Sequence, residues 1–136
     1  PLRMKDLPVR AKRAGVSITC LETVQLTDAA PFDLILIDAP CSGSGSWRRA
    51  PAGKWDLTED RLAELTAIQA QILSSAAALT GTKGTLAYAT CSMLGVENDD
   101  QITQFVAANP EWSIGFSRLW TPLEDGDGFF AAHLTR

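Results

Sequence analysis

Hydrophobic and polar positions alternate along the chain in blocks that predict strands and helices in turn. Residues 34–37 form a continuous run of leucine and isoleucine between two aspartates, which is typical of a parallel strand buried on both faces. Residues 85–90 predict a second buried strand. Between the two strands, apolar residues recur at helical spacing up to position 79, and Thr58 followed by two acids is a typical helix start.

Weaker patterns flank this strand–helix–strand unit. Before it, they predict a basic helix over residues 2–14 and an alternating strand over 16–19. After it, they predict a helix with acids in its first turn over 97–106, and two strands over 112–114 and 129–134. Glycines are expected to end the first helix and the long central one. Strands that alternate with helices imply right-handed crossovers, so we predict one α/β domain over residues 1–136 with a mainly parallel sheet.

Composition narrows the class of protein. The 136 residues are 46% hydrophobic and 21% charged, which excludes a disordered or collagen-like chain. The longest apolar run falls far short of the roughly 20 residues that span a bilayer. The first residues lack both an initiator Met and the layout of a secretory signal, so we expect an internal start and a cytoplasmic protein with no membrane partner.

The net charge of -4 has the wrong sign for binding nucleic acid by bulk electrostatics, so any RNA contact is expected to be local. One basic, aromatic stretch offers such a contact. Arg48, Arg49 and Lys54 lie between Trp47 and Trp55, a combination that suits phosphate binding and base stacking. The alternative interpretation is a solvated loop with buried tryptophans.

Two of the three cysteines follow the two buried strands. Cys41 lies in a loop of small residues after the first strand, and Cys91 comes directly after the second. Ligands bind beyond the carboxyl ends of parallel strands, so neighbouring strands would bring both thiols to one cleft. With no CxxC pair and a single histidine, the sequence predicts no metal site. Two thiols in a reducing compartment suggest nucleophilic catalysis or a redox pair.

A pyrimidine is a suitable substrate for such a cleft. Addition of a thiolate at C6 of cytosine makes C5 nucleophilic toward a sulfonium methyl group, and a base must then remove the C5 proton before the thiolate can leave. A carboxylate beside the ring would hydrogen-bond to or protonate N3 and the exocyclic amine. Asp38, Cys41 and Cys91 supply one carboxylate and two thiols.

Several motifs occur together in a recognisable order. The chain closely resembles the Sun/Fmu-type (RsmB-like) family of RNA cytosine-5 methyltransferases in Asp38–Gly45, Arg48-Arg49, Lys54-Trp55, Gln69, Ala89–Ser92, Glu97-Asn98 and Asp127–Ala132. The resemblance runs from residue 32 to residue 136. It implies a Rossmann-like class I S-adenosylmethionine-dependent methyltransferase fold, with RNA, either ribosomal or transfer, as the substrate.

The resemblance also implies roles for single residues. Cys91 would be the nucleophile on C6, and Cys41 would assist release of the product. Asp38 matches an acid at the junction of cofactor and target base, Pro40 helps to shape the same loop, and Glu22 falls near the cofactor adenine. These three residues would lie at the S-adenosylmethionine site, and Asp38 would also lie next to the target cytosine.

The chain departs from the family at its front. The glycine-rich loop after the family's first strand and the acid after its second strand are not found. The resemblance therefore implies the C-terminal part of a catalytic domain, truncated at the N-terminus, with the missing N-terminal part as a potential partner. Two other hypotheses stay open: a non-catalytic RNA-binding fragment or partner of a complete methyltransferase, and a thiol oxidoreductase with a Cys41–Cys91 disulfide.

Overall fold

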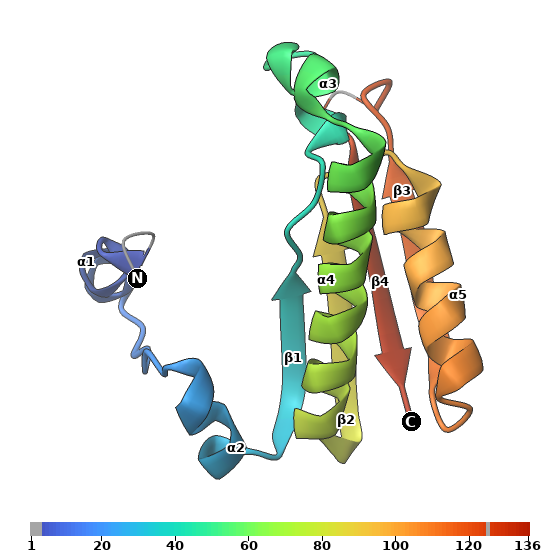
Figure 1. The fold of residues 1–136 in the computed structure, drawn as a ribbon. Coiled ribbons are helices and arrows are strands. Elements are labelled where there is room, and N and C mark those ends of the chain that lie inside the picture. The colour runs from blue at the N-terminus through green and yellow to red at the C-terminus, as the bar shows by residue number, and fades with distance from the viewer. Residues whose placement is uncertain (1–3, 125) are drawn as a thin grey trace.

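The computed structural model describes residues 4–124 and 126–136, which build a four-stranded sheet covered by helices on one face (Figure 1). The strand order is β1-β2-β4-β3. The strands span Phe32–Asp38 (β1), Thr80–Thr90 (β2), Ser113–Trp120 (β3) and Phe129–Thr135 (β4). β1 and β2 are parallel, whereas β4 runs antiparallel to both of its neighbours, β2 and β3.

The two longer helices, α4 and α5, lie side by side on the sheet (Figure 1). The helices span Leu7–Ala14 (α1), Leu26–Ala29 (α2), Ala52–Asp56 (α3), Glu59–Leu79 (α4) and Asp99–Ala108 (α5). Short 3-10 turns cover Thr23–Gln25 (η2), Ser44–Ser46 (η3) and Gly95–Glu97 (η4). α1 lies away from the sheet, and α3 lies at the end where β1 and β2 finish (Figure 1).

Helix α4 begins where the sequence predicts. The Thr58 hydroxyl accepts a hydrogen bond of 3.1 Å from the Arg61 N–H, and so caps the first turn. Leu65 and Leu73 point into the core and are buried. In the described part of the chain, α4 is the one helix long and apolar enough to cross a membrane, which is weak support for a span because core helices pass the same test.

The core lies between the sheet and these helices. Leu86, Tyr88, Phe130 and Leu134 point toward α4 and α5 and are fully buried. Alternate residues of a strand face opposite sides of its sheet, so Leu34 and Leu36 of β1 lie on the other face. They are 63% and 69% exposed, because no helix in the described residues covers that face.

The architecture confirms the predicted α/β fold but differs from the sequence prediction in several details. The strand at residues 34–37 is not buried on both faces as predicted, since Leu34 and Leu36 are exposed. The sheet is mixed rather than mainly parallel, because β3 and β4 are joined directly by residues 121–128 and form a hairpin, which is antiparallel. The predicted strand at 16–19 is wrong, since this segment is irregular and has no strand beside it in the described residues. The predicted start of the first helix includes residues 2 and 3, which lie outside the described residues.

Gly81 and Gly84 do not end α4 in the way that the sequence suggests. Both lie inside β2, which starts directly after the helix. A Cβ atom on Gly84 would come within 2.8 Å of the Phe32 carbonyl oxygen, so the absence of a side chain lets β1 and β2 approach each other here. That residues 1–136 form a single domain stays a prediction.

Candidate active site

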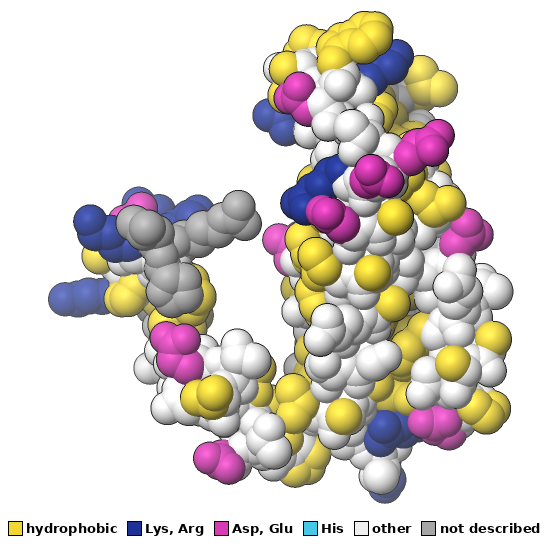
Figure 2. Space-filling model, in the orientation of Figure 1, with side chains coloured by type: hydrophobic (Ala, Val, Ile, Leu, Met, Phe, Trp, Pro, Cys, Tyr) yellow, Lys and Arg dark blue, Asp and Glu magenta, His cyan; other side chains and the backbone are white. Residues whose placement is uncertain are grey.

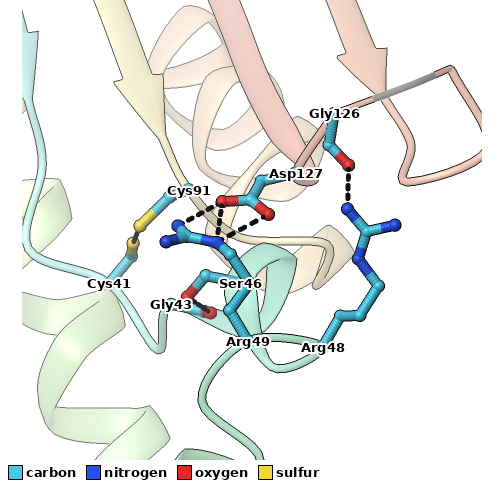
Figure 3. A network of polar contacts seen from close by, with 8 residues as sticks. All are labelled: Cys41, Gly43, Ser46, Arg48, Arg49, Cys91, Gly126 and Asp127. Carbon is cyan, nitrogen blue, oxygen red and sulfur yellow. Dashed lines mark hydrogen bonds and ion pairs between the residues drawn. The ribbon is translucent and has the colours of Figure 1, made fainter.

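The two thiols predicted to share a cleft lie next to each other. Asp38, the last residue of β1, is in register with Ala89 of β2, and the Ala39 N–H continues the ladder by donating to the Ala89 carbonyl at 2.9 Å. The loops that leave the two strands therefore start side by side. The Sγ atoms of Cys41 and Cys91 are 3.4 Å apart (Figure 3).

The environments of these two thiols differ. Cys91 is exposed to solvent, whereas Cys41 is only partly accessible. Burial disfavours the thiolate and is the main reason why the pKa of Cys41 is raised to about 12, and the neighbouring Cys91 raises it further. At neutral pH Cys41 is thus a protonated thiol, able to donate a hydrogen bond to the Cys91 sulfur.

Glycines hold three loops together around the thiols. The Gly45 N–H donates to the Cys91 carbonyl at 3.0 Å, and the Gly128 N–H donates to the Gly45 carbonyl at 2.9 Å. A Cβ atom on Gly45 would lie 2.0 Å from the Gly128 carbonyl oxygen. Only glycine at position 45 lets the loop before β4 contact the Cys41 loop.

A buried polar cluster lies beneath the thiols. The Ser44 hydroxyl accepts from the Met93 N–H at 2.8 Å and is 3.0 Å from the Ser92 hydroxyl. Glu97 is fully buried and accepts hydrogen bonds from both thiol loops. From the sequence, Glu97 is interpreted as an acid at a helix start, so its contacts with the two thiol loops are not predicted. The serine that follows each cysteine is the sequence signal for a shared hydrogen-bond partner.

The residues predicted to bind the cofactor are spread more widely. Asp38 is exposed at one end of a groove of about 640 Å³, whose wall is formed mostly by apolar side chains of β1 and α4. The Pro40 carbonyl accepts a hydrogen bond of 2.9 Å from the Gln69 amide, which fixes the loop that carries Cys41. Glu22 is exposed next to η2, where its N–H donates to the Gln25 side chain at 2.8 Å. It is not among the groove residues, although Thr23 is.

Two of the three predicted RNA-binding residues, Arg48 and Arg49, lie near the thiols (Figure 3). The Arg49 guanidinium forms an ion pair with Asp127, and Arg48 donates to the Gly126 carbonyl at 3.4 Å (Figure 3). Hydrogen bonding to Arg49 lowers the pKa of Asp127, and the same contact raises the pKa of Arg49. Lys54 lies over the Trp55 ring, 5.6 Å from its centroid.

Basic side chains form separate groups on the surface in view, some over α1 and others near α3 (Figure 2). Across residues 4–124 and 126–136, no three His, Cys, Asp or Glu side chains are grouped so that they could hold a metal ion.

Comparison with known proteins agrees with the resemblance seen in the sequence. The family model described as 16S rRNA methyltransferase RsmB/F matches residues 1–135. The chain is 39% identical over 149 aligned residues to ribosomal RNA small subunit methyltransferase B of Salmonella arizonae, covering 98% of this chain and 34% of the relative. The protein of the same name from Klebsiella pneumoniae is 44% identical over 114 residues, which are 77% of this chain and 26% of the relative.

Solved structures share the fold. The crystal structure of PH0851 has a TM-score of 0.86 and 32% identity, over 99% of this chain and 35% of that one. NSun6 from Pyrococcus horikoshii, solved with SFG, has a TM-score of 0.81 and 21% identity over 98% of this chain and 38% of that one. The chain spans about a third of the length of these proteins. Its fold is that of S-adenosylmethionine-dependent methyltransferases, and the chain belongs to the RsmB/F family of 16S rRNA methyltransferases.

Proposed function

We propose that this chain is part of an enzyme that transfers a methyl group from S-adenosylmethionine to C5 of a cytosine in ribosomal RNA. Cys91 forms a covalent bond to C6, and Cys41 assists release. The observation that carries the proposal is the pair of thiols 3.4 Å apart at the carboxyl ends of two adjacent parallel strands. Both thiols can therefore reach one pyrimidine ring.

The described residues fit one side of a cofactor site. Asp38 presents an exposed carboxylate where the apolar groove meets the Cys41 loop, and ligands of α/β sheets bind at such strand ends. Asp38 and Pro40 are the residues that would hold the cofactor near the target base. When bound, S-adenosylmethionine supplies an electrophilic methyl group.

The first step uses the exposed thiol. The Cys91 thiolate adds to C6, the new S–C6 bond uses its electron pair, and the electrons of the C5–C6 double bond become available for bonding the methyl group at C5. The Asp38 carboxylate accepts a hydrogen bond from the exocyclic amine and so orients the ring for attack at C6. Cys41 remains a neutral thiol beside the reacting sulfur.

The second step uses the partly buried thiol. Once Cys91 is bound to carbon it carries no charge, so one of the smaller causes of the raised pKa of Cys41 is removed, while burial remains. The partly accessible Cys41 thiol gives its proton to solvent water, and its thiolate then removes the C5 proton. The C5–C6 double bond re-forms, and the S–C6 bond breaks to return the Cys91 thiolate. Cys41 is therefore more available as a base once the covalent bond between Cys91 and C6 has formed.

RNA binding is assigned to Arg48, Arg49 and Lys54, which lie on the loop and short helix that follow Cys41. The positions of Arg48 and Arg49 let phosphate contacts form beside the thiols rather than at a distant surface. Since the matched relatives are bacterial proteins named for ribosomal RNA, the cytoplasm stays the expected compartment.

A covalent trap tests the proposal. RNA that contains 5-fluorocytosine is incubated with S-adenosylmethionine and the full-length enzyme that carries this segment, because fluorine blocks the final elimination. We expect a protein–RNA species on a denaturing gel that is lost in Cys91→Ala and kept in Cys20→Ala, the matched control at an exposed cysteine. An adduct that persists in Cys91→Ala would remove it as the nucleophile.

The same gel decides between the proposal and the non-catalytic alternative. Natural RNA replaces the fluorinated substrate, and Cys41→Ala is expected to accumulate a covalent species because the C5 proton has no base. If Cys41→Ala turns over at the wild-type rate without an adduct, the release role is wrong. An adduct formed by residues 1–136 alone would show that this segment is catalytically competent by itself.

A further inference from the structure

One fully buried carboxylate connects the two thiol loops. Glu97 lies in η4, and its side chain accepts four hydrogen bonds. The donors are the Ser42 N–H at 2.8 Å and the Gln69 amide at 3.0 Å on Oε1, with the Ser42 and Ser92 hydroxyls at 2.5 Å each on Oε2. A buried carboxylate is stable only when its oxygens are hydrogen-bonded, and here each oxygen receives two bonds.

The donors to Oε2 are the residues that directly follow the two cysteines. Ser42 comes after Cys41, and Ser92 comes after Cys91. The two serine hydroxyls are also 3.3 Å from each other, so the carboxylate oxygen brings together two backbone segments that are far apart in the sequence. This shared contact lies one residue beyond each of the two cysteines, whose sulfur atoms are 3.4 Å apart.

Glu97 is also hydrogen-bonded to residues of β2 and α4. The Tyr88 hydroxyl, from the middle of β2, donates to the Glu97 carbonyl at 2.8 Å. The Gln69 amide, from α4, bonds both to Glu97 and to the Pro40 carbonyl in the Cys41 loop. The Glu97 backbone is therefore bonded to the sheet through Tyr88, and its carboxylate is bonded to the covering helix through Gln69.

We propose that Glu97 is a positioning residue that holds the Cys41 and Cys91 sulfurs at the separation required for their two steps on one pyrimidine. It acts through Ser42 and Ser92 and does not contact the substrate. The proposal rests on the proposed function for its catalytic consequence, because both thiols must reach adjacent ring carbons. Misplacement of a reacting group by about 1 Å costs on the order of 100-fold in rate.

The test measures the thiol pair directly in the full-length enzyme. In buffers of glutathione and its disulfide, Cys41 and Cys91 exchange with the oxidant to give one protein disulfide and two molecules of glutathione, and the fraction oxidised reports their effective concentration. Glu97→Gln keeps the shape but replaces one acceptor oxygen by an NH₂ donor that faces other donors. We expect the effective concentration to fall about tenfold or more.

Activity gives the second measurement. Glu97→Gln is expected to lower kcat about 10- to 100-fold while the KM values for RNA and cofactor stay unchanged, since the binding residues are untouched. Glu111→Gln, at an exposed position before β3, is the matched control and should change neither quantity. Thermal unfolding is recorded for both variants, so a general loss of stability is recognised.

Ser92→Ala and Ser42→Ala keep the proposal testable if Glu97→Gln does not fold. Each removes one donor to Oε2, and each should lower the effective concentration of the pair. An unchanged effective concentration in these folded variants, whatever happens to kcat, would overturn the positioning role. The disulfide measurement needs no methyl transfer, so it stays informative if cytosine methylation itself is disproved.

Discussion

Arg49 and Asp127 form an ion pair although they are 78 positions apart in the sequence. The pair joins the loop after Cys41 to the loop before β4, beside the two sulfur atoms (Figure 3). Its arginine is one of the three side chains assigned to RNA. The cation is thus oriented at the site and its charge is partly neutralised by Asp127. In the proposed RNA complex, a phosphate would replace this carboxylate.

Removal of the carboxylate should make this cation more available. Asp127→Asn is expected to strengthen binding of a single-stranded RNA and to steepen its salt dependence, by a slope of about 0.7 in log K against log salt for each added phosphate contact. Arg49→Ala should do the opposite. Filter binding at several salt concentrations measures both, with Glu111→Gln as the control. Equal slopes for all variants would contradict RNA contact by Arg49.

The ion pair also predicts a pH dependence of stability. The pKa of Asp127 is lowered from its ordinary value of 3.8 by hydrogen bonding to Arg49. A group with a depressed folded pKa contributes stability above its unfolded pKa and loses it as the pH falls through the folded value. The stability difference between wild type and Asp127→Asn should therefore be present at neutral pH and vanish in strong acid. Urea unfolding across this range tests the sign.

Unequal burial of the two thiols predicts unequal reactivity. At pH 7 to 8, Cys41 should react with iodoacetamide at least about tenfold more slowly than Cys91, because its pKa is raised to about 12 and the thiolate is the reactive form. Peptide mapping by mass spectrometry gives both rates. In Cys91→Ala the Cys41 rate should rise, since the neighbour no longer raises its pKa. Similar rates at both cysteines of the wild type would contradict the asymmetry.

Close contact between the loops predicts a strict need for glycine at position 45. Gly45→Ala should separate the loop before β4 from the thiols, because a Cβ atom there would overlap the Gly128 carbonyl. We expect methyl transfer to fall at least about tenfold. Gly95→Ala is the control, since a Cβ atom on Gly95 meets nothing within 4 Å. Retained activity in Gly45→Ala would show that the loop contact is dispensable.

The packing of α4 predicts a difference between its two faces. Leu73 is 1% exposed in the core, so Leu73→Ala should lower the free energy of unfolding by about 2 to 5 kcal/mol. Ile68 lies on the same helix but is 39% exposed, and Ile68→Ala should cost clearly less. Chemical denaturation compares the two. Equal losses of unfolding free energy in the two variants would contradict the burial of Leu73 in the core.

The sequence predicts those elements that depend on local signals. Thr58 as a cap, the apolar spacing of α4 and the β-branched and aliphatic run of β1 each act within a few residues, and each element forms where the sequence predicts it. The predicted burial of β1 on both faces is wrong, because Leu34 and Leu36 are exposed. The meeting of Cys41 and Cys91 also follows from the order of strands. The cap, the helix spacing and the strand run can be recognised without knowledge of the rest of the molecule.

What the sequence does not predict depends on distant partners. Acids that precede a helix are usually exposed, so Glu97 became recognisable as a buried group only when Ser42, Ser92 and Gln69 surrounded it. Gly84 has the pattern of a helix end, but its function is the close approach of β1. Residues 16–19 alternate like a strand, yet a strand forms only beside another strand.

The free side of β1 has a practical consequence for work with this segment. In the described residues, β1 bonds to β2 along one edge only, and Leu34 and Leu36 are exposed beside its other edge. An open edge with apolar neighbours is a template on which other chains aggregate. Solutions of the isolated segment should therefore lose soluble protein as concentration rises, so its kinetics are best measured dilute and compared across dilutions.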